Sequence, residues 1–385
     1  MTKQFNFLPD QYKKNNSKIN HNYLKNQFSD YKRILNKISK VVQKNDFTLG
    51  SEVNKFEKNI SKLIKARYVL AVGSGTDAIM LSLKCLGIRE GDEVITTPFT
   101  FYATIGAIVT SGAKPVFVDI KDDYNIDPDL IEKKITKKTK AILPVHWGGK
   151  ICDMKKIMDI SKKYSIPVVE DSCHAILAKK YEKFAGNFGQ MGCFSLHPLK
   201  NLNVWGDGGF IAIKRFKDFK KLSLMRNHGL INRNKTLMFS YNSRLDTIQA
   251  VVANHLLKKL KNITKKRIIN SKYLDKKLNQ FKQIDLIPRD IKSKEVFHLY
   301  CLRIKEKKKQ IINLLKKNSI DVKVHYPIPM HLQPAAKKFG YKKGSFPIAE
   351  QIAKETISLP VHEFITKKDL NKIISIFKKI YEKKN

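Results

Sequence analysis

One lysine of this chain, Lys200, lies in a stretch without other cations, FSLHPLKNLNVWGDGG at residues 194–209. Most other lysines stand in runs such as KKITKKTK, which are typical of exposed helix faces. A lysine whose amine is buried loses its proton more easily, and the neutral amine is a nucleophile toward aldehydes. The alternative is a surface lysine whose stem covers apolar residues while its amine stays in water. Lys200 is thus a candidate covalent anchor for an aldehyde.

Two further motifs supply groups that would bind an aldehyde cofactor. The loop GSGTDA at 73–78 follows an apolar run and opens a helical pattern, and amides at a helix start bind phosphate. Asp171 ends IPVVEDSCHA, at the carboxyl end of a predicted strand, where open α/β sheets bind ligands. Phosphate, aldehyde and a ring nitrogen that needs an acid together describe pyridoxal 5′-phosphate (PLP). Lys200 would form the Schiff base, and Asp171 would keep the pyridinium nitrogen protonated.

The same motifs leave alternatives open. GSGTDA also fits the dinucleotide pattern G-x-G-x-x-A, which requires an acidic residue about 20 positions later, at the end of the next strand. That strand ends in Thr96 and Thr97, and Asp119 belongs to the strand after it, so a nicotinamide cofactor lacks its ribose contact. Each motif taken alone also fits a purely structural role. GSGTDA then forms a tight turn without any ligand, and Asp171 is a helix N-cap.

The strong positive charge of the chain invites a different function. The 75 basic and 34 acidic residues give a net charge of +41, as in proteins that bind nucleic acids or anionic membranes. However, the arginines that specific base recognition depends on are few, and the lysines are spread over the whole chain. We therefore predict a solvated lysine-rich surface with neither nucleic acid nor membrane as a partner, whose charge attracts an anionic substrate.

The cysteines and the apolar runs indicate the cellular compartment of the protein. Five cysteines at wide spacings, without a C-x-x-C pair, indicate neither a disulfide framework nor a zinc site, so we expect no bound metal. Unpaired cysteines are typical of a reducing compartment. The N-terminus lacks the apolar segment of a secretion signal, and no run approaches the ~20 residues that span a bilayer. The sequence predicts a cytoplasmic protein.

A β–α alternation positions these motifs. It predicts an α/β fold with a mostly parallel sheet of seven strands, part of it antiparallel or irregular where the last two strands lack a full helix between them. Helical patterns at 78–87, 104–112, 129–135 and 154–164 separate the first five strands. The strands are expected at 67–72, 93–97, 115–120, 141–145, 167–171, 193–196 and 210–214.

The flanking segments complete the predicted architecture. Residues 1–25 are polar and receive no predicted structure, helices are expected at 31–44 and 52–65, and a long helical stretch follows residue 245. Beyond Pro288 we expect strands at 296–304 and 321–326, and helices at 308–318 and 366–381, the last capped by Thr366 with Asp369. The predicted division is an N-terminal arm and helix at 1–44, a large PLP-binding domain at 45–289 and a small α+β domain at 290–385.

From about residue 45 to its end, the chain resembles the nucleotide-sugar aminotransferases of the DegT/DnrJ/EryC1/StrS family. The resemblance implies fold type I, the aspartate aminotransferase-like fold of PLP-dependent transferases. Eight motifs carry it in order: GSGTDAIMLSL, EVITTPFTFYAT, PVFVDI, VVEDSCHA, CFSLHPLKNL with GDGG, RNHG, YNSRLDTIQA, and HYPIPMHLQP followed by FGYKKGSFPIAE and SLP.

The resemblance also implies a role for each matching residue. Lys200 is the covalent anchor and general base, Asp171 faces the pyridine nitrogen, His174 lies near the phenolic oxygen, and Phe101 stacks on the ring. Asn242 reaches the phosphate from a neighbouring subunit, which implies a homodimer with shared active sites. The phosphate cradle consists of the amides of Gly75, Thr76 and Asp77 with the hydroxyl of Ser195, and the sugar-nucleotide pocket contains His325, Tyr326 and His331.

The implied reaction moves an amino group from L-glutamate to a keto-sugar nucleotide, for cell-surface polysaccharide or glycan synthesis. Related proteins without the lysine are dehydratases, so Lys200 favours amino transfer. The segment after Lys200 contains Leu202, Gly206 and Asp207, in the K-x-L-x-x-x-G-D-x-G pattern of members that act on 3-keto sugars. His197, where many of those members carry an aromatic residue, leaves 4-keto sugars as the alternative.

Overall fold

The centre of the molecule is a seven-stranded sheet. The computed structural model describes residues 17–21 and 23–382. Parallel bridges from Ile142 to Val168 and from Val145 to Asp171 join two hydrogen-bonded groups of strands, giving the order β3-β2-β4-β5-β8-β9-β1. All pairs are parallel except those of β9, which runs antiparallel to both neighbours, as expected near the last strands. The strands are β1 (Tyr68–Val72), β2 (Glu93–Thr96), β3 (Lys114–Phe117), β4 (Thr139–Ile142), β5 (Val169–Asp171), β8 (Met191–Ser195) and β9 (Gly209–Ile213).

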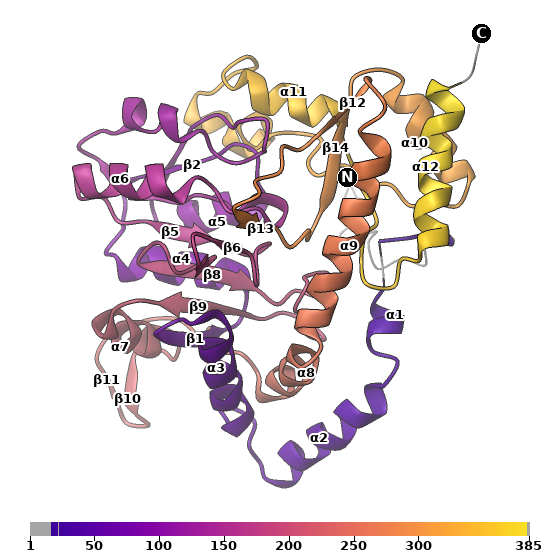
Figure 1. Cartoon of the computed structure of the whole chain (residues 1–385). Coiled ribbons are helices and arrows are strands. Elements are labelled where there is room, and N and C mark those ends of the chain that lie inside the picture. Colours follow the sequence, from indigo (N-terminus) through magenta and orange to yellow (C-terminus); the bar gives the residue numbers. More distant parts are fainter. Residues whose placement is uncertain (1–16, 22, 383–385) are drawn as a thin grey trace, which may run out of the picture.

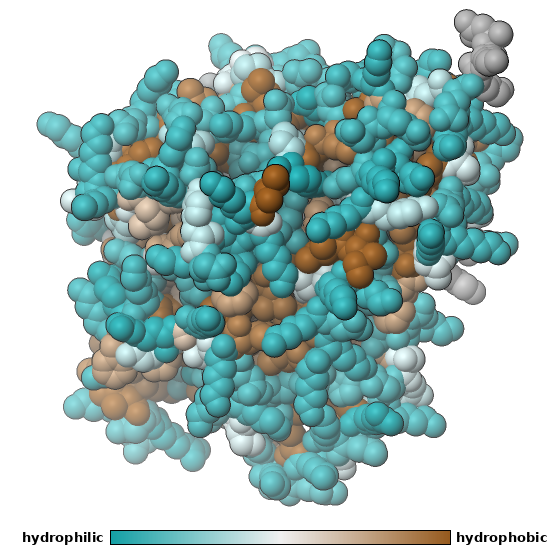
Figure 2. Space-filling view, viewed as in Figure 1, coloured by the Kyte–Doolittle hydropathy of each residue, from teal (hydrophilic) through white to brown (hydrophobic). Residues whose placement is uncertain are grey.

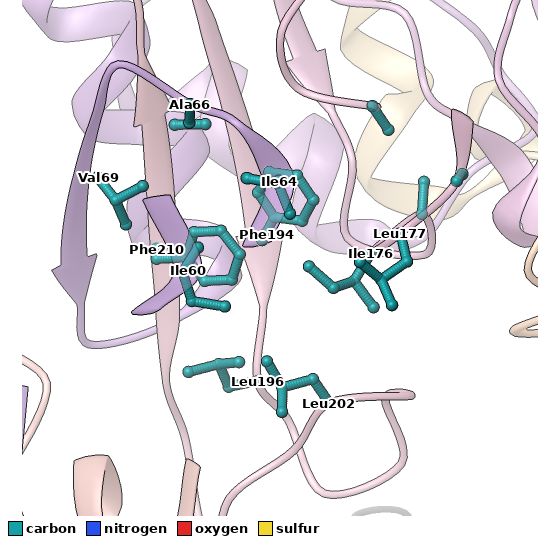
Figure 3. Packing of buried hydrophobic residues seen from close by; sticks show 14 of the residues in the cluster. Ile60, Ile64, Ala66, Val69, Ile176, Leu177, Phe194, Leu196, Leu202 and Phe210 are labelled. Carbon is teal, nitrogen blue, oxygen red and sulfur yellow. The ribbon is translucent and has the colours of Figure 1, made fainter. Parts of the chain in front are cut away.

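Helices cover both faces of this sheet, because neighbouring side chains along each strand point to opposite sides. On one face Phe194 stacks on Phe210, with ring centroids 4.4 Å apart, and Ile60 packs beside them (Figure 3). On the other face Cys193 and Ile211 meet a second apolar cluster. The first cluster takes residues from α3 (Ser51–Ile64), α6 (Met154–Tyr164) and α8 (Thr247–Leu257), the second from α4 (Gly75–Cys85), α5 (Tyr102–Thr110) and α7 (Phe216–Met225). The predicted α/β fold is confirmed.

The C-terminal part forms an antiparallel sheet of its own. Its order is β12-β14-β15, with strands Ile284–Leu286, Tyr300–Ile304 and Thr356–Leu359. The helices α9 (Leu260–Leu278), α10 (Lys308–Lys317) and α12 (Lys367–Tyr381) share an apolar cluster with this sheet, and α11 (Pro347–Glu355) packs in a separate one (Figure 1). The division of the chain into domains at residues 44 and 289 stays a prediction.

Three predicted elements differ in the structure. The expected strand at 321–326 is wrong: only Lys323 pairs, through both its backbone groups with Ser358, and the following residues turn away to line a cavity. The expected helix at 129–135 is two 3₁₀ turns, Pro128–Leu130 and Glu132–Lys134, because so short a segment gains little from helical propagation. The strand expected from residue 296 begins at Tyr300, since Val296 and Leu299 bond to a neighbouring loop instead.

The described N-terminal residues are well anchored, including those before residue 26, for which no structure was predicted. Ile19 pairs with Ile320 as a short parallel bridge and is buried in the C-terminal cluster. The short helix α1 (Leu24–Gln27) and the longer α2 (Tyr31–Gln43) follow (Figure 1). Buried residues of α2 join the first cluster of the large sheet. Predictions for residues 1–16 and 22 lie outside the described residues.

The surface agrees with the lysine-rich composition. Figure 2 shows one face that is mostly hydrophilic and carries only small apolar patches. No helix within residues 17–21 and 23–382 is both long and apolar enough to cross a membrane.

The cap of α12 yields a first prediction. The Thr366 side chain accepts from the Asp369 amide, and the Asp369 side chain accepts from the Thr366 amide, so the predicted capping box is present. We expect Thr366→Ala to lower the free energy of unfolding by about 1 kcal/mol, measured by urea denaturation. Ser375→Ala, further along α12, is the control and is expected to change it by less than about 0.5 kcal/mol. Equal losses in both variants would contradict a capping role.

Candidate active site

A cavity of about 530 Å³ opens at the carboxyl ends of the parallel strands, where ligands bind in open α/β sheets. Residues from the large sheet form one side of it, and residues from the C-terminal part form the other. Nine of the residues predicted from sequence line this single cavity: Gly75, Thr76, Phe101, Asp171, His174, Ser195, Lys200, His325 and Tyr326.

Three predicted residues lie outside the cavity wall of this chain. The Asp77 amide donates to Ser74 Oγ at 3.0 Å, so Ser74 caps α4, and the Asp77 carboxylate accepts from the Ser243 hydroxyl. Asn242 is exposed and pairs with Asn227, just before the hairpin of β10 (Leu230–Asn232) and β11 (Lys235–Thr236). His331 is buried elsewhere: its Nε2 lies 3.0 Å from Glu350 Oε1. Its role in substrate binding stays a prediction.

The start of α4 forms a concave group of amides. Ser74 caps the helix, and Gly75 and Thr76 belong to its first turn, whose amides have no partner within a helix. A Cβ atom on Gly75 would lie 2.7 Å from Ser195 Cβ and 3.1 Å from Cys173 Sγ. Glycine therefore allows the helix start to touch the end of β8. This contact brings the free amides next to the Ser195 hydroxyl, an arrangement that suits a phosphate.

Asp171 is the buried acid of the cavity. It is 5% exposed, and its Oδ2 accepts from the Thr104 hydroxyl at 2.8 Å while its Oδ1 accepts from the Cys173 amide at 3.1 Å. Thr104 in turn lies 2.7 Å from the Thr100 hydroxyl. These donors fix the carboxylate and stabilise its charge, as a group facing a protonated ring nitrogen requires.

The neighbouring Glu170 points the other way and is completely buried. Its Oε1 accepts from the amides of Phe188 and Gly189, both at 2.7 Å. Its Oε2 accepts from the Gly186 amide and lies near His146 Nε2, each at 2.8 Å. The other ring nitrogen of His146 accepts from a backbone amide, so the proton lies on Nε2. The four donors satisfy Glu170 and hold the end of β5, from which Asp171 projects.

Lys200 ends a tight turn after β8. Its amide donates to the His197 carbonyl at 2.8 Å, and the turn directs its side chain into the cavity. Burial lowers the pKa of the amine, while Cys173 and Asp171 act weakly in the opposite direction. Phe101 stands at the rim with 48% of its surface exposed, an unusual state for a phenylalanine and one that leaves a ring face for stacking.

Six of the ten histidines of the chain line the cavity: His21, His174, His197, His298, His325 and His362. Burial lowers the pKa of His174 and His298 far below the usual range, with Lys200 adding to the effect. Burial also lowers the pKa of His325 and of His362 to about 3. These rings are neutral at neutral pH. The described residues contain no group of three or more His, Cys, Asp or Glu arranged to hold a metal ion.

The orientation of His174 follows from its neighbours. Its Nδ1 accepts from the Gly148 amide at 3.3 Å, so the neutral ring carries its proton on Nε2. His298 lies against it, with ring centroids 4.3 Å apart. His174 can therefore donate a hydrogen bond to an oxygen in the cavity, as expected of the group near the phenolic oxygen of PLP.

Sequence reasoning missed a second set of cavity residues. Apart from Thr104, they come from segments in which no local pattern indicated chemistry. Their partners are distant in sequence; for example, Tyr23 stacks on His362, with ring centroids 4.7 Å apart. For Thr104, its place one helical turn after Phe101 was a usable signal. The set comprises His21, Tyr23, Thr104, Arg267, His298, Asp321, Lys323 and His362.

These features fit PLP. The Gly75 contact leaves a cradle for phosphate, the Asp171 carboxylate is buried and oriented, and the Lys200 amine is desolvated in the same cavity. The volume also lies within the range of cofactor and substrate sites.

The sequence pattern of the DegT/DnrJ/EryC1/StrS aminotransferase family matches residues 29–378. The chain belongs to this family. Relatives of this aminotransferase include the "pleiotropic regulatory protein" of Geobacillus stearothermophilus, 38% identical over 88% of this chain and 92% of the relative. The dTDP-3-amino-3,6-dideoxy-α-D-galactopyranose transaminase of Aneurinibacillus thermoaerophilus is 36% identical, and the UDP-2-acetamido-2-deoxy-3-oxo-D-glucuronate aminotransferase of Pseudomonas aeruginosa 34%; each match covers 89% of this chain and 94% of the relative.

Solved structures agree with this assignment. DesV of S. venezuelae, in complex with a ketimine intermediate, superposes with a TM-score of 0.91 and 30% identity, covering 94% of this chain and 98% of DesV. NtdA of Bacillus subtilis, with bound PMP, superposes with a TM-score of 0.87 and 29% identity, covering 98% of this chain and 89% of NtdA. The predicted fold type I, the PLP cofactor and the aminotransferase activity are confirmed, and the nicotinamide alternative is not supported. The individual site roles stay predictions.

The environment of Lys200 yields a second prediction. In the cofactor-free protein we expect acetylation of Lys200 to show a pH midpoint below the ~10.4 of lysine in a model peptide, because burial disfavours the ammonium form. Competitive acetylation followed by mass spectrometry measures this midpoint. Asp171→Asn removes an anion that favours the ammonium form and should lower the midpoint further. A midpoint at or above that of the peptide would contradict the buried state of the amine.

Proposed function

We propose that this aminotransferase moves an amino group from L-glutamate to a keto-sugar nucleotide, most favourably a 3-keto sugar, for the synthesis of cell-surface polysaccharide or glycan. The observation that carries the proposal is the meeting of three groups in one cavity: the desolvated Lys200 amine, the oriented Asp171 carboxylate and the amides at the start of α4. The cavity continues past them between His325, Tyr326 and His362, with room for a sugar.

The residues of the chain divide the work of the reaction. When bound, PLP withdraws electrons from the bond that breaks at the amino-bearing carbon. The Lys200 amine would take the proton from that carbon and deliver it to the carbon of the former aldehyde, on the other side of the shared nitrogen. The first step requires the neutral amine, which burial favours. Asp171 stabilises positive charge at the ring nitrogen, and His174 donates from Nε2 to an oxygen of the ring.

Neutral histidines suit a sugar substrate. Imidazole rings donate and accept hydrogen bonds without adding charge, so they match hydroxyl groups on a sugar. His325 is held by Ser358, with 2.8 Å between Nδ1 and Oγ, and the Tyr326 ring lies 6.1 Å from that of Phe101. We assign this pair to the sugar-nucleotide side of the cavity. The lysine-rich surface attracts the anionic nucleotide toward it.

Two observations favour amination at C3. Asp207, from the K-x-L-x-x-x-G-D-x-G pattern, lines the cavity next to the predicted cofactor residues. Several relatives are named for 3-amino or 3-oxo sugars, including those of A. thermoaerophilus and P. aeruginosa. A 4-keto-sugar nucleotide is the second candidate, favoured by the histidine at 197.

The five free cysteines fit a reducing compartment, and we place the activity in the cytoplasm.

We also propose that the enzyme works as a homodimer. The hairpin that precedes Asn242 exposes large apolar side chains, among them Ile231, Leu237 and the fully exposed Phe239. Such surface is costly in water and is typical of an interface. An interface here would direct Asn242 toward a second subunit, as the phosphate contact from a neighbour requires.

The substrate proposal is tested with a panel of nucleotide sugars. We expect glutamate-dependent amination of one or more 3-keto-sugar nucleotides, with kcat/KM at least about tenfold above that for 4-keto analogues. Mass spectrometry of the product locates the new amino group. Lys200→Ala should abolish transfer, because both the anchor and the base are lost. Amination of 4-keto sugars alone would contradict the C3 assignment, and no transfer to any keto sugar would overturn the proposed function.

The shared active site is tested by mixing two inactive variants. We expect Lys200→Ala and Asn242→Ala to be inactive or weak alone, but to regain roughly a quarter of wild-type activity after exchange of subunits. Half of the dimers would then be mixed, and one of their two sites would carry neither substitution. Sedimentation confirms that dimers form. Mixtures no more active than their components would show that Asn242 serves its own chain.

A further inference from the structure

The backbone carbonyl of Lys200 is held from two sides. Asn203 Nδ2 donates to this oxygen at 2.8 Å, and the Tyr23 hydroxyl lies 3.4 Å from it and 3.5 Å from the Leu199 carbonyl. The same Nδ2 group of Asn203 donates to Gln27 Oε1 at 2.8 Å, and Gln27 Nε2 donates to Glu363 Oε1 at 2.9 Å. A continuous path of hydrogen bonds thus runs from the C-terminal part, through the N-terminal segment, to Lys200.

The Glu363 carboxylate at one end of this path determines the donor and the acceptor of each hydrogen bond. An ionised carboxylate only accepts, so Glu363 requires the Nε2 group of Gln27 on its side. The Oε1 atom of Gln27 must then face Asn203, which has to present its Nδ2 donor. That donor is also the group that reaches the Lys200 carbonyl. Reversing any one amide would place two acceptors against each other.

Burial makes these bonds costly to lose. Gln27 is 4% exposed and Asn203 is fully buried. Gln27 is also the buried residue of the four-residue helix α1, a position where an apolar side chain would pack at lower cost. A buried amide that loses its partners has a desolvation penalty without compensation. Packing alone therefore does not explain the side-chain amide of Gln27. Its hydrogen bonds lead through Asn203 to Lys200.

The N-terminal segment is itself fixed to the C-terminal part. The amide of Asp321 donates to the Ile19 carbonyl at 2.7 Å. His362 Nε2 lies 2.9 Å from the Asn20 carbonyl, and its ring stacks on Tyr23. The segment is thus a strap that reaches from the substrate side of the cavity to the loop that carries Lys200.

We propose that Gln27 is a positioning residue for Lys200, acting through Asn203 on the lysine carbonyl, with Tyr23 acting on the same oxygen directly. The Asn203 donor on this carbonyl, with the Tyr23 hydroxyl beside the same turn, restricts rotation of the peptide that follows Lys200. This keeps the side chain directed into the cavity and away from water. The inference rests on the proposed role of Lys200 as anchor and base.

The main test compares Gln27→Met with Gln351→Met. Methionine keeps the length of glutamine and removes both hydrogen-bonding groups. Gln351 is the matched control, since its Nε2 also donates to a glutamate, Glu355 Oε1 at 3.0 Å, but on the exposed face of α11. Competitive acetylation of Lys200 in the cofactor-free protein over a pH series is the first readout, and kcat and KM of the loaded enzyme are the second.

For Gln27→Met we expect the acetylation midpoint of Lys200 to rise by roughly half a pH unit or more, because the amine gains access to water. We expect kcat to fall about tenfold while KM for the amino acceptor stays within about twofold. Gln351→Met should match the wild type in both readouts. A lower melting temperature for Gln27→Met with an unchanged midpoint and unchanged kcat would overturn the proposal, because it would show a structural role alone.

A second variant covers the case in which Gln27→Met does not fold. Tyr23→Phe removes one hydroxyl and keeps the ring, and it should move the Lys200 midpoint in the same direction by a smaller amount. No movement there would overturn the proposal. The acetylation readout also separates this inference from the proposed function. A protein that aminates no keto sugar, yet shows the midpoint shift, would contradict the substrate assignment and leave the positioning role supported.

Discussion

Two adjacent carboxylates at the end of β5 point to opposite sides of the sheet, and the rest of the site depends on this alternation. Glu170 faces the protein interior, where three backbone amides and His146 bind it. Because these donors come from the loop before β8 and from the residues after β4, Glu170 ties both neighbouring strands to β5. Asp171 can then project into the cavity at a fixed height. Glu170 secures the sheet, and the Asp171 carboxylate lines the cavity.

The charge of the molecule is separated in a way that serves this site. The chain carries a net charge of +41, yet His174, His298 and His325 in the cavity are neutral because burial lowers the pKa of each. Burial acts on Lys200 in the same direction. Positive charge therefore lies on the surface, where it attracts anions from a distance. Inside the cavity, the uncharged rings of these histidines offer hydrogen bonds without repelling the Lys200 amine.

Local pattern was sufficient for the large sheet and for the residues attached to its strand ends. Apolar runs of four to six residues predicted all seven strands, and Gly75, Asp171 and Lys200 could be placed because each follows or ends such a run. Local pattern failed where the position of a residue depends on partners that are distant in the sequence. The N-terminal segment reads as polar and unstructured because Gln27 is buried by hydrogen bonds and not by an apolar stripe. The alternation at 321–326 indicates a strand. Only Lys323 pairs with a neighbouring strand, however, and His325 and Tyr326 line the cavity.

The two sides of the cavity come from different parts of the chain. The large sheet and its helices supply every predicted cofactor contact within this chain, whereas His325, Tyr326 and His362 come from the C-terminal part. The motif HYPIPMH shows the same separation on a small scale. His325 and Tyr326 line the cavity, but His331 is bound to Glu350, which also accepts from the Gly344 amide. We infer that the end of this motif holds a loop in place while its start meets the substrate. Changes of sugar should then fall at its start, and changes at its end should alter stability.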